Sequence, residues 1–120
     1  MNLNELIKAI KKHPDFDNVG MILSHTGFVR SISRTGRKVT GLAVSVDHEK
    51  LRQVIQTQKS RPGIVEILVQ IAENQPLSVG DDVMLLLVAG DIRENVIPVL
   101  SDTLNAIKTT VTEKTEYFSH

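Results

Sequence analysis

Four basic residues lie close together near the end of the first third of the chain: Arg30, Arg34, Arg37 and Lys38, with no acidic residue between them. A guanidinium group donates paired hydrogen bonds to phosphate or carboxylate, so such a cluster can bind an anion. The alternative is a solvated hairpin tip whose charges only face water. The segment SISRTGRK (31–38) is rich in Ser, Thr and Gly, which indicates a turn between two strands.

Two lysines near the C-terminus form a second candidate group. Lys108 lies on a predicted helix and Lys114 lies just beyond its predicted end. A partly desolvated amine can act as a nucleophile or as an acid–base group. A lysine near a helix C-terminus can equally be there to complement the helix dipole, and Lys114 stands between Glu113 and Glu116, which could simply neutralise it.

The third candidate is the segment GDIREN (90–95), which joins an apolar run to a predicted helix. Free backbone N–H groups and the helix dipole make a helix N-terminus a favourable place for an anion. Asp91 and Glu94 also have the spacing of a reciprocal helix cap, which would explain both acids without any function. Arg93 is not needed for such a cap, so it remains a candidate anion-binding residue.

The composition excludes several classes of function. The chain has 14 basic and 14 acidic residues, which argues against a generic nucleic-acid binder, and its few aromatic residues supply few stacking surfaces for RNA. The absence of cysteine excludes disulfides and thiol catalysis by this chain. No metal site is expected, because the histidines lie far apart in the sequence, at His13, His25, His48 and His120.

No part of the sequence resembles a membrane span or an export signal. The longest strongly apolar run, Val83–Ala89, is far shorter than the roughly 20 residues that a transmembrane helix needs. The N-terminal segment has charged residues scattered through it, unlike a signal peptide. We therefore expect a soluble cytoplasmic protein with no membrane partner.

Hydrophobic periodicity predicts one domain over residues 1–120 with the element order α-β-β-α-β-β-α-β. The predicted helices cover residues 2–12 and 48–60, and a third helix starts within 92–95 and carries an apolar stripe to 111. The predicted strands cover residues 19–29, 39–47, 64–72, 83–89 and 113–118. We expect strand 39–47 to pair with strand 19–29, and strand 83–89 to be central and buried on both faces. The fold class is α+β, a two-layer sandwich of an antiparallel or mixed sheet with packed helices.

Three stretches together resemble the catalytic (large) subunit of molybdopterin synthase, the MoaE family. VGMILSHTGFVR (19–30) is similar to the family's "GA…F.GTVR", and PLSVGDDVMLLLVAGDIRENVIPVL (76–100) is similar to "L..GE..V.V.V...HR..AF". LNAIKTTVTEK (104–114) is similar to "…LK…P.WK.E". The resemblance spans roughly residues 19–116 and implies the family's α/β-hammerhead type of fold.

The resemblance also implies roles for individual residues. Lys108 matches the family's catalytic lysine and Lys114 the second lysine of the tail, while Arg30 and Arg93 match its substrate-binding arginines. We add Arg34 and Arg37 to the expected substrate-binding residues, which are then Arg30, Arg34, Arg37 and Arg93. The family's reaction needs no metal or bound cofactor.

The family also implies partners. Its members form homodimers, and each subunit binds a small ubiquitin-like sulfur carrier, a MoaD-like protein. The carrier's C-terminal Gly-Gly thiocarboxylate enters the large subunit and gives sulfur to cyclic pyranopterin monophosphate, which produces the dithiolene of molybdopterin. Carrier tail and pterin phosphate are both anionic, which suits converging cations.

The sequence departs from the family pattern in its second and third stretches. Ile92 stands where the family has a histidine, and the tail lacks the family's Pro-aromatic-Trp lead-in to Lys114. The alternative to an enzyme is therefore a non-catalytic MoaE-like paralogue that acts as a dimeric anion- or protein-binding regulatory module, since a fold survives the loss of its reaction.

Overall fold

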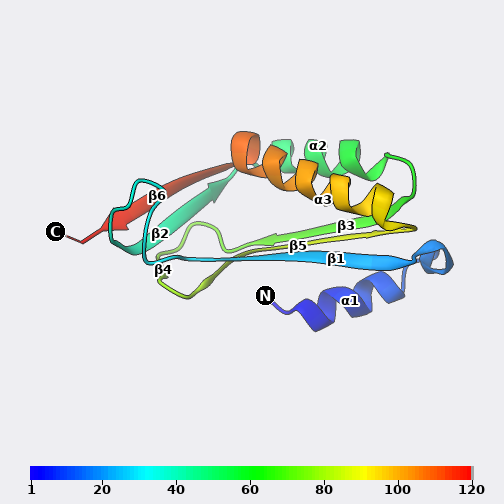
Figure 1. The fold of residues 1–120 in the computed structure, drawn as a ribbon, viewed down its shortest axis with the longest axis horizontal. Coiled ribbons are helices and arrows are strands. Elements are labelled where there is room, and N and C mark those ends of the chain that lie inside the picture. The colour runs from blue at the N-terminus through cyan, green and yellow to red at the C-terminus, as the bar shows by residue number, and fades with distance from the viewer. Residues whose placement is uncertain (120) are drawn as a thin grey trace.

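A computed structural model describes residues 1–119, so the expectation for His120 lies outside the described residues. The molecule is elongated, with extents of 53 × 26 × 24 Å, and contains two three-stranded antiparallel sheets side by side along its length (Figure 1). Three α-helices pack on the first sheet. The expected α+β class is confirmed.

The first sheet has the strand order β1-β5-β3, with β1 at Met21–Phe28, β3 at Ile64–Ile71 and β5 at Asp82–Gly90. The side chains of Leu86, Leu87, Val88 and Ala89 have no exposed surface. The predicted central strand, buried on both faces, is thus confirmed. Side chains alternate along a strand, so successive residues of β5 enter different hydrophobic cores on the two faces.

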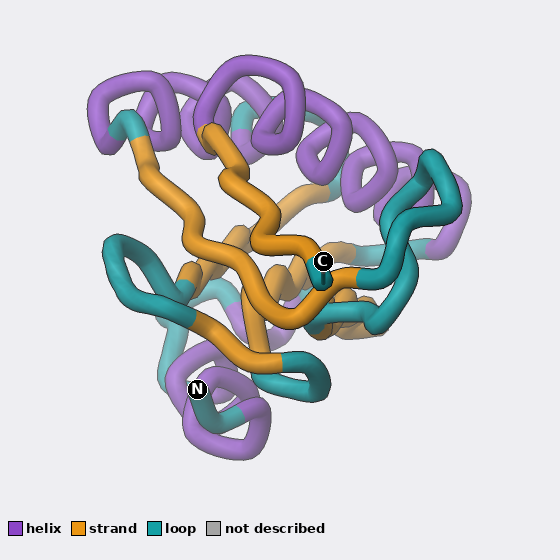
Figure 2. Tube along the Cα trace, turned by 90° about the vertical axis from the view of Figure 1, so that its left-hand side faces the viewer, coloured by secondary structure: helices purple, strands orange, loops and turns teal. Residues whose placement is uncertain are grey.

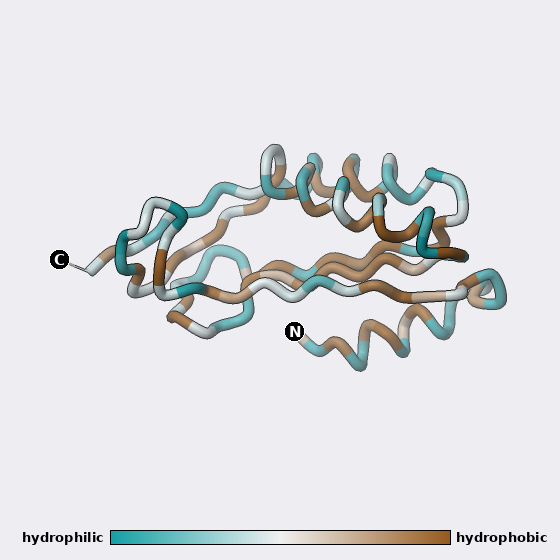
Figure 3. Tube along the Cα trace, viewed as in Figure 1, coloured by the Kyte–Doolittle hydropathy of each residue, from teal (hydrophilic) through white to brown (hydrophobic). Residues whose placement is uncertain are grey.

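Helices cover both faces of this sheet. α2 (His48–Lys59) and α3 (Arg93–Ala106) lie on one face, and α1 (Leu3–Lys11) lies on the other, as Figure 2 shows. The apolar side of each helix is turned towards the strands (Figure 3). Side chains cap two of these helices at their N-termini: Asn2 accepts a hydrogen bond from the Glu5 N–H, and Asp47 accepts one from the Lys50 N–H.

The second sheet has the order β4-β2-β6, with β2 at Val39–Val46, β4 at Leu77–Ser78 and β6 at Thr112–Phe118. A separate small core lies beneath it, made of the buried residues Val29, Val39, Leu42, Val44 and Leu77. Three short elements were not expected from the sequence: β4, a 3₁₀ turn at Phe16–Asn18 and a π-helical turn at Ile107–Val111.

The expected pairing of strand 39–47 with strand 19–29 is wrong. β1 pairs along its whole length with β5, whereas β2 pairs with β6 and briefly with β4. The physical reason is that β5 is apolar on both faces and needs a hydrogen-bonded neighbour on each edge, and β1 and β3 fill those two positions. The segment 29–38 then carries the chain across to the other sheet.

No helix among residues 1–119 is long and apolar enough to cross a membrane. The last α-helix begins at Arg93, inside the range expected for its start, and Pro98 lies in its second turn on the exposed side. Its backbone continues directly into the π-helical turn and then into β6.

Candidate functional site

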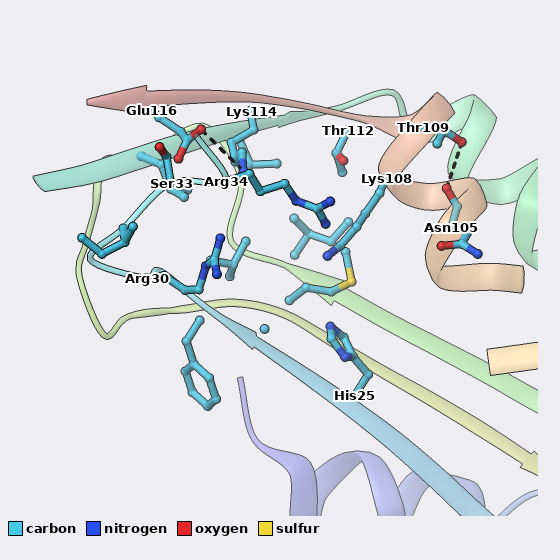
Figure 4. A pocket seen from close by; sticks show the side chains of 18 residues that line it. His25, Arg30, Ser33, Arg34, Asn105, Lys108, Thr109, Thr112, Lys114 and Glu116 are labelled. Atoms are coloured by element: carbon cyan, nitrogen blue, oxygen red, sulfur yellow. Dashed lines mark hydrogen bonds and ion pairs between the residues drawn. The ribbon is translucent and has the colours of Figure 1, made fainter. Parts of the chain in front are cut away.

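A cavity of about 1060 Å³ lies where the two sheets meet the C-terminal end of α3 (Figure 4). Its walls come from β1, β2, the ends of β3 and β5, the segment 29–38, the π-helical turn and β6. Its polar side chains are those of His25, Arg30, Ser33, Arg34, Asn105, Lys108, Thr109, Thr112, Lys114 and Glu116.

Arg30 and Arg34 enter the cavity wall from the segment that follows β1. This segment is folded back on itself: the Ser33 N–H donates to the Arg37 carbonyl at 2.9 Å, and the Ser33 hydroxyl accepts from the Arg37 N–H at 3.1 Å. The predicted turn is confirmed. Both arginines are exposed, and the folded segment places them at one wall of the cavity.

Lys108 is placed by the π-helical turn Ile107–Val111. Threonine hydroxyls bond back to the preceding carbonyls there: Thr109 to Asn105 at 2.8 Å and Thr110 to Ala106 at 2.6 Å. π-turns are rare and occur often at functional sites. The turn buries Ile107 and leaves the Lys108 side chain directed into the cavity, as Figure 4 shows.

Lys114 reaches the same cavity from β6, where its Cα lies opposite that of Val44 on β2. Its ammonium group lies 3.8 Å from the Glu116 carboxylate on the same strand. Side chains two residues apart on a strand share a face, which places Lys114 and Glu116 together at the cavity wall. Glu116 is the acidic group of this lining.

His25 is a titratable cavity residue that was not predicted from the sequence as part of the site. Residues 21, 23, 25 and 27 of β1 share the face turned to α3, where Met21 and Leu23 pack in the core and His25 lines the cavity. The alternation along β1 was the available signal. Burial lowers the pKa of the His25 imidazole below its ordinary value, and the positive charge of Lys108 lowers it further.

Arg37 and Arg93 do not line this cavity. The Arg37 guanidinium stacks over the Phe118 ring, 3.8 Å from its centroid, so it joins the basic segment to the end of β6. Arg93 begins α3, about 22 Å along the helix axis from Lys108 at 1.5 Å per residue. Its Nε lies 3.2 Å from Glu94, and its side chain is 78% exposed.

The expected meeting of Arg93 with the other cations is thus not found within residues 1–119 of one chain. The reciprocal cap of Asp91 and Glu94 is also wrong. The Asp91 carboxylate accepts instead from the Ile92 N–H at 2.6 Å and from the Asn95 amide at 2.9 Å, and Glu94 pairs with Arg93. These bonds, led by that from Asn95, hold the pKa of Asp91 below its ordinary value.

The charged lining of the cavity is mainly basic. Three segments far apart in the sequence contribute its cations: 30–34, the π-helical turn, and β6. Together with Glu116 they give the lining a formal charge of +3 while His25 is neutral. Among residues 1–119, no group of three His, Asp or Glu side chains is arranged to hold a metal ion.

The family model described as "MoaE protein" matches residues 1–110, so it includes Lys108 and ends before Lys114. No curated protein matches the chain in sequence.

Three solved structures are similar to this one. The structure of molybdopterin cofactor biosynthesis protein E from Burkholderia multivorans has a TM-score of 0.78 at 18% identity, over 99% of this chain and 82% of that one. Molybdopterin synthase from Staphylococcus aureus has a TM-score of 0.73 at 22% identity, over 86% and 77%. A complex of subunits 1 and 2 of molybdopterin-converting factor from Helicobacter pylori has a TM-score of 0.73 at 18% identity, over 98% and 80%. These likenesses show a shared fold.

Proposed function

Because the chain belongs to the MoaE family of molybdenum cofactor biosynthesis, we propose that it is the large subunit of a molybdopterin synthase and that its cavity is the site of sulfur transfer. The observation that carries the proposal is the convergence of Arg30, Lys108 and Lys114 on one cavity from three separate segments. These are three of the four residues to which the resemblance assigned a role, and nothing about their spacing in the sequence required them to meet.

Each cation has a distinct part in the proposed reaction. Arg30 and Arg34, on the folded segment 29–38, hold the phosphate of the pyranopterin or the carboxylate of the carrier tail through paired hydrogen bonds. Lys108 stabilises negative charge on the reacting group or bonds to it transiently, and Lys114 assists the movement of charge or of a proton. Holding both reactants in one cavity supplies the proximity that the transfer needs.

The sulfur donor in this proposal is a small ubiquitin-like, MoaD-like carrier protein with a C-terminal Gly-Gly thiocarboxylate. Support comes from the family and from the similar fold of a complex of two molybdopterin-converting factor subunits. The cavity opens to solvent and carries an excess of positive charge, which suits an anionic peptide end.

A homodimer of this chain in the cytoplasm is part of the same proposal.

A second candidate function is a non-catalytic MoaE-like binding module. It is favoured by Ile92, which stands at the position of the family's histidine and is 52% exposed at the start of α3. The adjacent Arg93 lies outside the cavity and pairs with Glu94. Under this alternative, the cavity still binds anions but transfers no sulfur.

Reconstitution of sulfur transfer distinguishes the two functions. The purified protein is mixed with a thiocarboxylated carrier and cyclic pyranopterin monophosphate, and molybdopterin is detected by mass spectrometry. We expect product with the unchanged chain, at least 100-fold less with Lys108→Ala, and an unchanged yield with Lys8→Ala on the far side of the sheet. Carrier binding without any product would support the binding module instead.

A further inference from the structure

His25 lines the cavity, and its surroundings indicate a role in binding a ligand there. We propose that His25 is a ligand-binding residue of this cavity and that its imidazole takes up a proton when an anion binds there. The inference rests on the proposed function only in requiring that the cavity binds anions, and it holds for a catalytic or a non-catalytic protein.

The first observation is that the ring faces the cavity without a hydrogen-bond partner. Within residues 1–119, the imidazole of His25 makes no hydrogen bond, whereas His48 bonds to Glu73 at 2.7 Å and His13 accepts from the Asp15 N–H at 3.0 Å. Both nitrogens of the His25 ring are therefore available to a ligand. The ring is half-buried and its nitrogens are not fully enclosed, so solvent or a ligand can reach them from the cavity.

The second observation is the open space beside the ring. Gly27 follows on the same face of β1, and a Cβ at that position would lie 3.5 Å from the His25 Nε2 atom. Glycine has no such atom, so the cavity extends up to this nitrogen. On the neighbouring strand, Met84 supplies an apolar wall that has no competing polar group.

The charged groups around the ring come from every polar wall of the cavity. The segment after β1 contributes Arg30 and Arg34, the π-helical turn contributes Lys108, and β6 contributes the pair of Lys114 and Glu116. The parts of β5 and β3 that line the cavity are apolar. Positive charge therefore predominates on the side that the ring faces, and Figure 4 shows Lys108 and His25 directed towards each other.

This surrounding charge explains why the proton arrives with the ligand. In the empty cavity, burial and the charge of Lys108 hold the pKa of His25 below its ordinary value, so the ring is neutral near neutral pH. A bound anion cancels part of the neighbouring positive charge and itself attracts an imidazolium. Both effects raise the affinity of the ring for a proton, and by linkage a protonated ring raises the affinity for the anion.

A competing explanation is that the ring only fills space. The family string given above has a phenylalanine at the position of His25, and an aromatic side chain of that size could pack on Met84 without any polar role. The variants His25→Phe and His25→Gln separate the two explanations. Phenylalanine keeps the ring and loses the nitrogens, whereas glutamine keeps hydrogen bonding and cannot gain a charge.

The test is calorimetric titration of the full chain with sodium sulfate, which stays a dianion across the range used. Titrations near pH 6.5, about the ordinary pKa of imidazole, are run in two buffers of different ionisation enthalpy, which reports protons taken up on binding. We expect a clear fractional uptake, up to one proton per site, and a sulfate affinity that falls by up to tenfold per pH unit above that range. His48→Gln, a histidine outside the cavity, serves as the matched control and should behave like the unchanged chain.

In His25→Gln and His25→Phe the proton uptake should disappear and the sulfate affinity should become independent of pH. NMR titration of the His25 ring in the unchanged protein, with and without sulfate, gives the same answer without any variant, and its pKa should rise when sulfate is present. Sulfate binding without proton uptake, or uptake that persists in both variants, would overturn this inference and leave the proposed function standing. No sulfate binding at all would overturn both.

Discussion

Removal of the Lys108 charge should weaken anion binding in the cavity by a predictable amount. Lys108→Met keeps a long apolar side chain and lowers the formal charge of the lining from +3 to +2. A pair of unit charges about 4 Å apart is worth about 4 kcal/mol at an effective dielectric constant of 20 and about 1 kcal/mol in water. The cavity opens to solvent, so we expect a loss of about 1–3 kcal/mol, which is about a 5- to 150-fold weaker Kd.

The assay is sulfate titration at low ionic strength, followed by calorimetry or by amide chemical shifts. Lys8→Met is the matched control, because α1 packs on the opposite face of the first sheet and Lys8 projects from its exposed side. The difference between the two variants should shrink as salt is added, since added ions screen the cavity charges. If Lys108→Met and Lys8→Met bind sulfate equally well, the reasoning that the cavity binds anions through Lys108 is refuted.

Three further predictions concern the stability of the first sheet and of the start of α3. Leu87→Ala removes a side chain with no exposed surface from the central strand, and should lower the free energy of unfolding by about 2–5 kcal/mol in urea denaturation. Gly63→Ala should lower the free energy of unfolding by about 1–3 kcal/mol in the same assay, because Gly63 has φ +79° and a Cβ there would lie 2.7 Å from the Asp91 Cγ. An unchanged urea midpoint would contradict this prediction. The folded state holds the pKa of the Asp91 carboxyl below its unfolded value, so this carboxylate adds stability above its unfolded pKa and loses it as the pH falls through its folded pKa. Asn95→Ala removes the main hydrogen bond to Asp91 and should therefore lower Tm more at neutral pH than in acid. An equal loss of Tm at both pH values would count against this prediction.

The longer helices and strands of the fold could be predicted from the sequence because their signals are local. The cap at Asp47, the apolar run in β5 and the stripe of α3 each depend on residues within a few positions of one another. Strand pairing could not be predicted in the same way. β2 pairs with β6, whose residues come some seventy positions later, and no local feature of either strand distinguishes that partner from β1.

The candidate site likewise has features that the sequence predicts and features that only the folded chain shows. The basic segment and the two lysines were visible by residue type, but only the folded chain shows that Arg30 and Lys108 share a cavity and Arg93 does not. The π-helical turn that directs Lys108 depends on threonine hydroxyls bonding to backbone carbonyls, which no hydrophobic period reveals. His25 was missed because a single histidine in a strand-forming stretch has no motif around it.

The central claim is that this cavity receives the anionic end of a sulfur-carrier protein. The most direct measurement is a structure of the complex between this chain and a carrier protein ending in Gly-Gly, in which the terminal carboxylate of the carrier can be located. We predict that this carboxylate lies within hydrogen-bonding distance of Lys108 and of Arg30 or Arg34. A carrier tail bound at the start of α3 beside Arg93, with the cavity left empty, would contradict the claim.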